Sequence, residues 1–218
     1  MKSPIKMSLK TEILPILCVI FSGISSIMLY PRMPETIPTH WNFRGEIDNW
    51  GNSFSHVISI NAMIIGIYIM FIFLPYLDPK RDRYKQFEKI YHIIKNVLMV
   101  FLAGVLSITN LSAIGYPINV ALYIPIAVGI LFIILGNYLG KIKPNWFVGI
   151  RTPWTLSSEE TWNKSHRLGG KIFILSGFLI AIDGFLPESL RLPVFIFAMF
   201  ILLFGTLVGS YIIYRKNK

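Results

Sequence analysis

Six long apolar stretches divide the chain and constrain its fold more than any other feature of the sequence. They lie at about Glu12–Tyr30, Phe54–Leu77, Ile90–Ile114, Ile118–Gly140, Ile172–Leu186 and Leu192–Tyr214. A helix needs roughly 20 apolar residues to cross a bilayer core about 30 Å thick. Met63–Leu74 and Val194–Val208 have no polar face, whereas a helix on the surface of a soluble protein would have one. We therefore predict an all-α membrane protein with a bundle of six transmembrane helices.

The composition favours the same class. Hydrophobic residues make up 54% of the 218 residues and charged residues only 15%, whereas soluble proteins average about 25% charged residues. No polar stretch is much longer than about thirty residues, which is too short to fold alone without disulfides or a metal. The single cysteine, Cys18, excludes an intrachain disulfide framework. A cleaved signal peptide is a weaker interpretation of the N-terminus, because the first apolar stretch continues past its small residues to Tyr30.

Lysine and arginine are distributed unevenly over the connections between these stretches. The two terminal tails and the second and fourth connections hold 17 of them, and the first, third and fifth connections hold three. Basic residues accumulate on the cytoplasmic side of a membrane. We therefore predict that both termini are cytoplasmic, in a multi-pass protein of the cell membrane, and that the first connection is extracellular. Anionic lipid headgroups also account for the net charge of +10, so direct nucleic acid binding is not expected.

All five tryptophans lie in two of the connections. We divide the chain into an N-terminal three-helix half, residues 1–114, with an extracellular Trp-rich loop at 31–53, and a C-terminal half, residues 115–218, with a cytoplasmic Trp-rich loop at 141–170. In both loops, prolines fix the backbone φ angle and glycines permit turns with positive φ. We expect the first loop to be ordered rather than a loose tether. Asn52 or Ser53, at its end, is expected to cap the second helix.

Loop 141–170 has the capping-box spacing of a helix start from Ser157 to Glu160. A helix of about ten residues is predicted to follow, ended by Gly169-Gly170 and lying along the inner membrane surface. Trp162 and His166 are four residues apart and share one face of that helix. Two interpretations of Arg151 remain open: its planar guanidinium locks the loop, or it belongs to a cytoplasmic docking surface.

The two loops carry long sequence strings that resemble a known family. The first is Met33-Pro-Glu-Thr-Ile-Pro-Thr-His-Trp-Asn-Phe-Arg-Gly-Glu-Ile-Asp48, and the second is Lys143-Pro-Asn-Trp-Phe-Val-Gly-Ile-Arg-Thr-Pro-Trp-Thr-Leu156 followed by Trp162-Asn-Lys-Ser-His-Arg-Leu-Gly169. They resemble the SdpI family of bacterial membrane immunity proteins, with Met33 where leucine is more usual. The resemblance implies a multi-pass plasma-membrane protein that protects against a membrane-active peptide toxin. It also implies a relay to a cytoplasmic partner, a transcriptional repressor held at the membrane.

The candidate site residues fall into three groups. Those of the outer loop are Pro38, His40, Trp41, Asn42, Gly45 and Asp48. Those of the cytoplasmic loop and the helix end before it are Asn137, Pro144, Asn145, Trp146, Gly149, Arg151, Pro153, Trp154, Trp162, His166 and Arg167. The intramembrane polar candidates are Asp183 and Asn110. Asp183 is either a proton or ligand site inside the bundle, with asparagines as partners, or a group near the outer interface, which we favour because Pro187 follows closely.

No catalytic motif or cofactor motif is present. His40 with Glu46 and Asp48 has the residue types of an extracellular metal site, but a structural hydrogen bond is the favoured interpretation. We therefore expect no enzyme activity, no cofactor and no metal, and the lipid bilayer as the obligatory partner.

The alternative function is a small membrane transporter or exporter. Pro, Trp, Phe and Gly occur in the same order in both Trp-rich loops, and the two halves have opposite predicted topology. Inverted repeats of this kind underlie many transporters. The spacings differ between the loops, so coincidence is favoured over a 3+3 inverted repeat.

Overall fold

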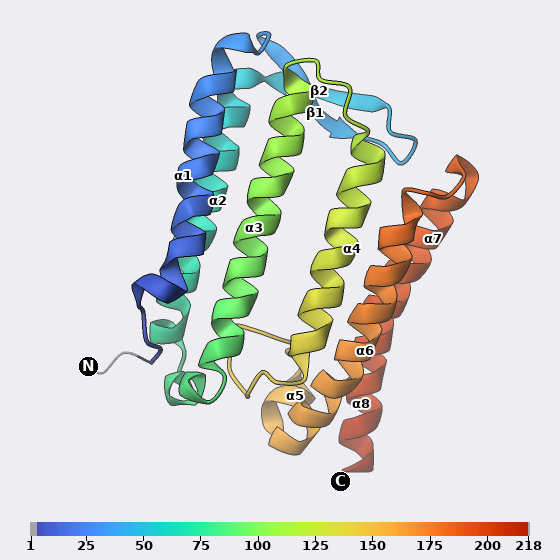
Figure 1. Cartoon of the computed structure of the whole chain (residues 1–218). Coiled ribbons are helices and arrows are strands. Elements are labelled where there is room, and N and C mark those ends of the chain that lie inside the picture. Colours follow the sequence, from blue (N-terminus) through green and yellow to red (C-terminus); the bar gives the residue numbers. More distant parts are fainter. Residues whose placement is uncertain (1–3, 218) are drawn as a thin grey trace.

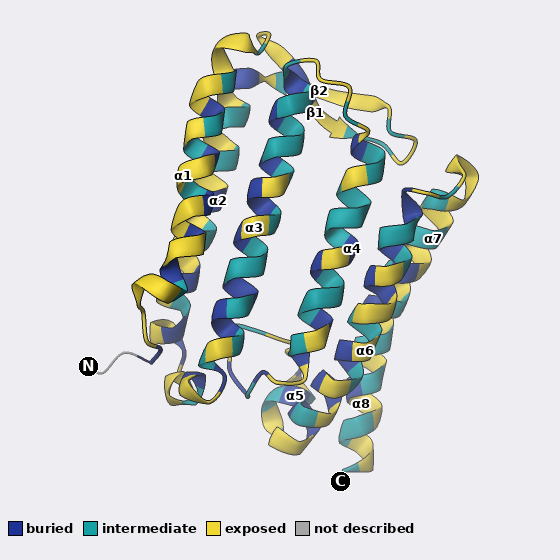
Figure 2. Ribbon diagram, viewed as in Figure 1, coloured by how far each residue is buried: buried dark blue, intermediate teal, exposed yellow. Residues whose placement is uncertain are grey.

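The computed structural model describes residues 4–217 and contains six helical segments long and apolar enough to cross a membrane. They are α1 (Leu9–Leu29), α2 (Ser53–Leu77), α3 (Glu88–Ala113), α4 (Val120–Leu139), α6 (Glu159–Asp183) and a last segment of α7 (Glu188–Phe200), a π-helical turn (Ile201–Gly205) and α8 (Thr206–Lys216). The outer surfaces of α1, α2 and α7 are largely exposed (Figure 2) and apolar, as lipid-facing surfaces are. The prediction of a six-helix, multi-pass membrane protein is confirmed.

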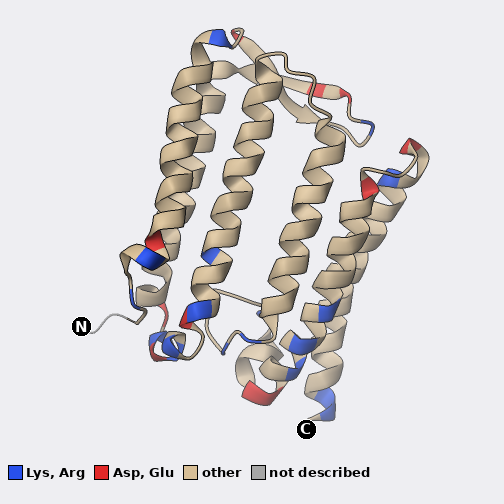
Figure 3. Cartoon of the chain, in the orientation of Figure 1, with Lys and Arg blue, Asp and Glu red and all other residues tan. Residues whose placement is uncertain are grey.

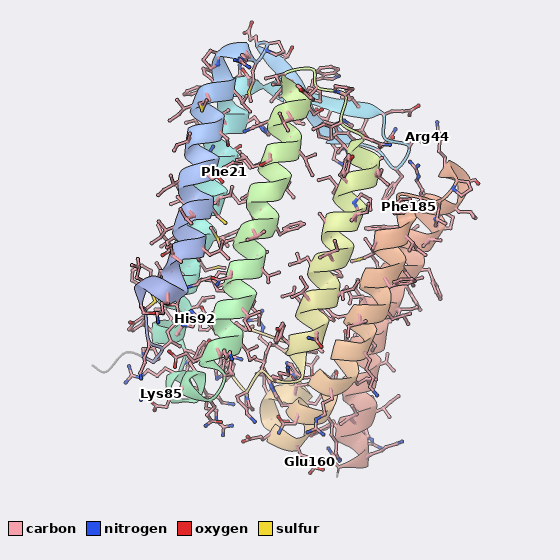
Figure 4. The ribbon with its side chains drawn as sticks, in the orientation of Figure 1. Phe21, Arg44, Lys85, His92, Glu160 and Phe185 are labelled. Atoms are coloured by element: carbon pink, nitrogen blue, oxygen red, sulfur yellow. The ribbon has the colours of Figure 1, made fainter. Side chains whose placement is uncertain are left out.

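The connections divide between the two ends of the bundle (Figure 1). Both described chain ends, the 3₁₀ turn Arg81–Gln86 and the short helix α5 (Pro153–Ser157) lie at one end. Most lysines and arginines gather at that end (Figure 3). Lys85 and Glu160 lie there, whereas Arg44 and Phe185 lie at the opposite end (Figure 4). The structure therefore puts the connections predicted to share a side at one end of the molecule.

The first loop is ordered, as expected, but it contains strands that the all-α prediction lacked. After the 3₁₀ turn Tyr30–Arg32, β1 (Thr36–Trp41) pairs antiparallel with β2 (Ile47–Asn52). The register is irregular on either side of His40, which is typical of a β-bulge. The hairpin extends across the ends of α3 and α4 (Figure 1). The Asn52 side chain accepts from the Ser55 N–H and caps α2, so the capping prediction is confirmed.

The predicted short interfacial helix ending at Gly169-Gly170 is wrong. α6 is one continuous helix that begins at Glu159, with Ser158 accepting from the Thr161 N–H at its start. The glycines lie inside α6 because they let it approach α4. A Cβ atom on Gly170 would lie 2.6 Å from the Gly136 carbonyl oxygen. Small residues favour this kind of close helix packing in membranes. Gly169 and Gly170 therefore serve helix packing here and do not end the helix as the sequence had suggested.

Candidate functional site

A cavity of about 500 Å³ lies beneath the hairpin, among α3, α4, α6 and α7. The hairpin contributes six lining residues: Thr39, His40, Trp41, Asn42, Phe43 and Asp48. The helices contribute nine: Thr109, Val120, Ala121, Ile124, Pro125, Val128, Ile180, Asp183 and Phe195. Four of the six predicted outer-loop residues therefore meet Asp183 in one pocket. Sequence analysis did not single out Phe43 or the apolar helical residues, which carry no signal apart from membrane hydropathy.

The tip of the hairpin is fixed by its own polar groups. The Asn42 side-chain oxygen accepts from the backbone N–H groups of Arg44 and Glu46, at 2.9 and 3.0 Å. Gly45 follows with φ of +84°, and a Cβ atom there would lie 2.8 Å from that of Ala121 on α4. An asparagine turn followed by a glycine of positive φ closes the loop and brings it against the helices. Predicted residues Asn42 and Gly45 thus shape the pocket roof.

Two further contacts define the roof. The rings of Phe43 and Phe195 have centroids 5.2 Å apart, which joins the hairpin tip to α7. His40 Nδ1 and Asp48 Oδ1 are 2.6 Å apart across the strands, and both side chains are partly solvent-exposed. This is the structural hydrogen bond favoured from the sequence. Among residues 4–217, no three His, Cys, Asp or Glu side chains come together in a way that could hold a metal ion. Pro38, also predicted, is buried within β1.

Asp183 is the last residue of α6, and only 3% of its surface is exposed. Within residues 4–217, its Oδ1 atom is buried and has no hydrogen-bond partner. Arg191 is close enough to interact with it electrostatically, but the guanidinium donates to the carbonyls of Leu186 and Gly184. In the alternative interpretation Asn110 was one of the asparagines that could pair with Asp183, but its amide donates to Ser26 of α1 at 3.4 Å.

At the other end of the molecule, loop 141–170 is a densely hydrogen-bonded layer. The Asn145 side chain is fully buried and makes four hydrogen bonds, accepting from the N–H groups of Phe147 and Val148 and donating to the carbonyls of Lys143 and Val148. This satisfies the amide completely. Asn145 therefore holds the loop in shape, with buried Pro144 beside it.

Trp162 and His166 form the centre of this layer. The Trp162 indole donates to the Ile142 carbonyl at 2.8 Å, and the rings of Trp162 and His166 stack with centroids 4.0 Å apart. His166 Nε2 accepts from the Ile150 N–H, so Nδ1 is assigned the proton that it donates to the Trp162 carbonyl. Gly149 has φ of +113°, and a Cβ atom there would lie 2.3 Å from His166 Nε2. The two residues share one face of a helix, as predicted.

Buried Asp78, at the end of α2, joins the second connection to this layer. Its carboxylate accepts from the Trp146 N–H at 2.9 Å and from the Tyr84 hydroxyl at 3.0 Å. Burial, together with the Asp78 charge, raises the pKa of the Tyr84 phenol, so the phenol stays protonated and donates. The Arg151 guanidinium donates to the Trp146 carbonyl at 2.7 Å, and its side chain is exposed, so both interpretations of Arg151 from the sequence stay open.

The remaining predicted residues of this region differ in exposure. The Trp154 indole donates to Ser210 of α8 at 2.6 Å, so it ties the loop to the last helix. Exposed residues are Asn137, Trp146, Arg151, Pro153 and Arg167. These five and Gly149 are exposed, whereas Asn145, Trp162 and His166 are buried.

Sequence reasoning missed a charged cluster in the N-terminal half. Lys95 of α3 is 1% exposed and donates to Glu12 of α1 at 2.5 Å. The Tyr68 hydroxyl of α2 donates to the same carboxylate at 3.0 Å. A buried pair of this kind is expensive to break, because removing one partner leaves an uncompensated charge. The cluster thus fastens α1, α2 and α3 together. In the sequence, the cluster is indicated only by the presence of two charged residues, Lys95 and Glu12, within apolar stretches.

Comparison with known proteins identifies both tryptophan-rich regions. The model of the SdpI/YfhL protein family matches residues 141–214, and the model of a domain of unknown function, DUF1648, matches residues 16–75. Immunity protein SdpI of Bacillus subtilis (strain 168) is 28% identical over 210 residues, which cover 95% of this chain and 98% of the relative. The chain is thus similar to the SdpI/YfhL family over its C-terminal part and to Immunity protein SdpI over nearly its whole length. No solved structure matches it significantly.

The two regions matched by these family models meet at the pocket. The hairpin belongs to the matched stretch 16–75, and Asp183 and Phe195 belong to the matched stretch 141–214. Residues from α3 and α4, between the two matches, complete the wall. The pocket is therefore a feature of the whole chain rather than of either region alone.

Proposed function

We propose that this protein confers immunity on its own cell against a secreted, membrane-active peptide. The observation that carries the proposal is the similarity to Immunity protein SdpI, which extends over nearly the full length of both chains. The lack of a catalytic motif in the sequence agrees with a binding role rather than an enzymatic one. Protection would then come from engaging the peptide, not from degrading it.

The pocket beneath the hairpin is the proposed place of engagement. With both termini cytoplasmic, as the lysine and arginine distribution favours, the hairpin faces the outside of the cell. A peptide that attacks the membrane from outside would meet this surface first. The hairpin side chains and the apolar helical wall form one continuous lining there.

Loop 141–170 is the proposed docking surface for a cytoplasmic partner. Trp146, Arg151 and Arg167 are exposed on a layer in which the buried side chains of Asn145, Trp162 and His166 make hydrogen bonds within the chain. Aromatic and arginine side chains are enriched at the centres of protein interfaces. A transcriptional repressor held there would report the presence of the toxin. The pocket takes its lining from both halves, 1–114 and 115–218, so sensing would involve both halves and relay would involve loop 141–170 of the second.

The alternative function, transport through an inverted 3+3 repeat, is not favoured, because the curated relative is an immunity protein. A distinguishing result would be uptake or efflux of a solute by the purified protein in liposomes.

The experiment that tests immunity is a survival assay. A sensitive bacterial host carries this chain, the Bacillus subtilis relative or an unrelated multi-pass membrane protein, at matched membrane levels, and is exposed to a series of membrane-active killing peptides. We expect this chain to raise the killing concentration of at least one peptide, and the unrelated protein to raise none. Unchanged killing by every peptide, with the relative protecting in parallel, would refute the proposal.

A further inference from the structure

The pocket beneath the hairpin combines an apolar wall with one carboxyl group, that of Asp183, whose Oδ1 atom has no hydrogen-bond partner among residues 4–217. Its helical wall is apolar except for Thr109 and Asp183. Asp183 is 97% buried, since only 3% of its surface is exposed, and it lines the cavity. Burial of a polar or charged group without a partner costs free energy. Such a group in a cavity is therefore a recognition element for a ligand that supplies the missing donor.

The charges around the pocket favour a cation as that donor. Asp48, the second carboxylate of the lining, is bonded to His40. Arg191 directs its guanidinium to two backbone carbonyls and does not donate to Asp183. An anion would meet two carboxylates, whereas an ammonium or guanidinium group would supply the donor that Asp183 Oδ1 lacks among residues 4–217. Charge-assisted hydrogen bonds to a carboxylate are about twice as strong as neutral ones.

The volume and the apolar wall of the pocket indicate the chemistry of the part of the ligand that does not contact Asp183. About 500 Å³ lies within the range of small-molecule sites and admits one or two large side chains, but not a folded domain. Val120, Ile124 and Val128 line one wall on α4. An occupant with an apolar body and a single cationic group would match both the wall and Asp183.

We propose that this pocket binds the cationic, apolar segment of a peptide, with the ammonium or guanidinium group on Asp183 and the apolar part against α4. This deepens the proposed immunity function, on which the identification of the occupant as a toxin segment rests. The ligand chemistry itself is tested without any toxin, so its failure and the failure of immunity are distinguishable.

The test uses three small probes with the same apolar cage and different charge: 1-adamantylamine, 1-adamantanol and 1-adamantanecarboxylate. Tritiated 1-adamantylamine is measured by scintillation proximity on the full chain in phosphatidylcholine nanodiscs, with empty discs as background and the other two probes as competitors. We expect saturable amine binding, competition by the alcohol only at roughly tenfold or higher concentration, and no competition by the carboxylate.

Asp183→Asn is the decisive variant, because it keeps the shape of the side chain and removes the charge. We expect amine affinity to fall by roughly tenfold or more. Glu188→Gln removes a carboxylate at the start of α7, outside the pocket lining, and should bind as the native chain does. A thermal melt of each variant separates lost binding from lost folding. Val128→Trp, which fills the cavity, should abolish binding of the amine and the alcohol alike.

Three results would overturn the proposal: no saturable amine binding by the native chain, equal binding by folded Asp183→Asn, or alcohol binding as tight as amine binding. Nanodiscs that contain phosphatidylethanolamine add a test of the source of the cation. If that lipid displaces the amine, a lipid headgroup and not a peptide is the occupant.

Discussion

Loop 141–170 and the pocket beneath the hairpin differ in the surroundings of their buried polar groups. In loop 141–170, the side chains of Asn145, Trp162 and His166 make hydrogen bonds to neighbouring backbone groups, whereas the buried hydroxyls of Thr161 and Ser165 have no partner among residues 4–217. In the pocket beneath the hairpin, Asp183 is buried with no partner for Oδ1 among the described residues, next to a cavity of about 500 Å³. Satisfied buried networks make a structure rigid, whereas unsatisfied groups at cavities often mark functional sites. The comparison distinguishes a hydrogen-bonded layer from the pocket that we propose as a binding site.

The largest expected effect is the loss of the Trp162 side chain. Trp162 is fully buried and its indole donates to the Ile142 carbonyl. We expect Trp162→Ala to lower the free energy of unfolding by about 3–5 kcal/mol, measured by SDS-induced unfolding in mixed micelles. Trp50→Ala in β2 is the matched control, since Trp50 is 58% exposed. If both variants unfold alike, loop 141–170 is not the rigid layer described above.

His166→Phe tests the hydrogen bonds of the same layer. The phenyl ring keeps an aromatic group against Trp162 but leaves the Ile150 N–H without its acceptor. We expect a loss of about 1–3 kcal/mol in the free energy of unfolding. Arg167→Ala, at the exposed neighbouring position, should leave the unfolding transition in place. A His166→Phe variant as stable as the native chain would show that stacking alone holds the loop.

Arg151→Ala sharpens the division between the structural layer and its exposed surface. The side chain is exposed and contributes one hydrogen bond to the Trp146 carbonyl. We expect a stability loss below about 1 kcal/mol in the same unfolding assay. A much larger loss would make Arg151 a structural lock and remove it from the proposed docking surface.

Asp183→Asn is expected to have the smallest effect on the free energy of unfolding. Unlike the other three substitutions, it is expected to raise this free energy or leave it unchanged. The substitution replaces a buried carboxyl that lacks a partner with a neutral group of the same shape. We expect the free energy of unfolding without ligand to stay equal or to rise by up to about 1 kcal/mol. A clear loss of stability would show that Asp183 is a satisfied structural group, and the contrast between the two regions would fail.

The sequence predicted the features that depend on composition and missed those that depend on packing. The six spans follow from runs of apolar residues, because the bilayer demands their length. The continuous helix α6 was not predicted, because Gly169-Gly170 is typical of a helix C-terminus. In the structure, packing of these glycines against Gly136 of α4 outweighs that local preference.

Contacts between residues far apart in the sequence could not be predicted from it either. Lys95 and Glu12 are 83 positions apart, so only the fold reveals their pairing. The predicted hairpin residues and Asp183 were singled out separately, and nothing local indicated that they line one pocket. Sequence analysis thus found much of the polar lining of the site but not its apolar wall.

The central claim is that protection is achieved in the pocket beneath the hairpin and not in loop 141–170. The most direct test is the survival of a sensitive host under a peptide against which the native chain protects, with Asp183→Asn and Arg151→Ala compared at matched membrane levels. We predict that Asp183→Asn loses protection while Arg151→Ala keeps it. Full protection by Asp183→Asn, with loss in Arg151→Ala, would contradict the account and move the function to the cytoplasmic loop.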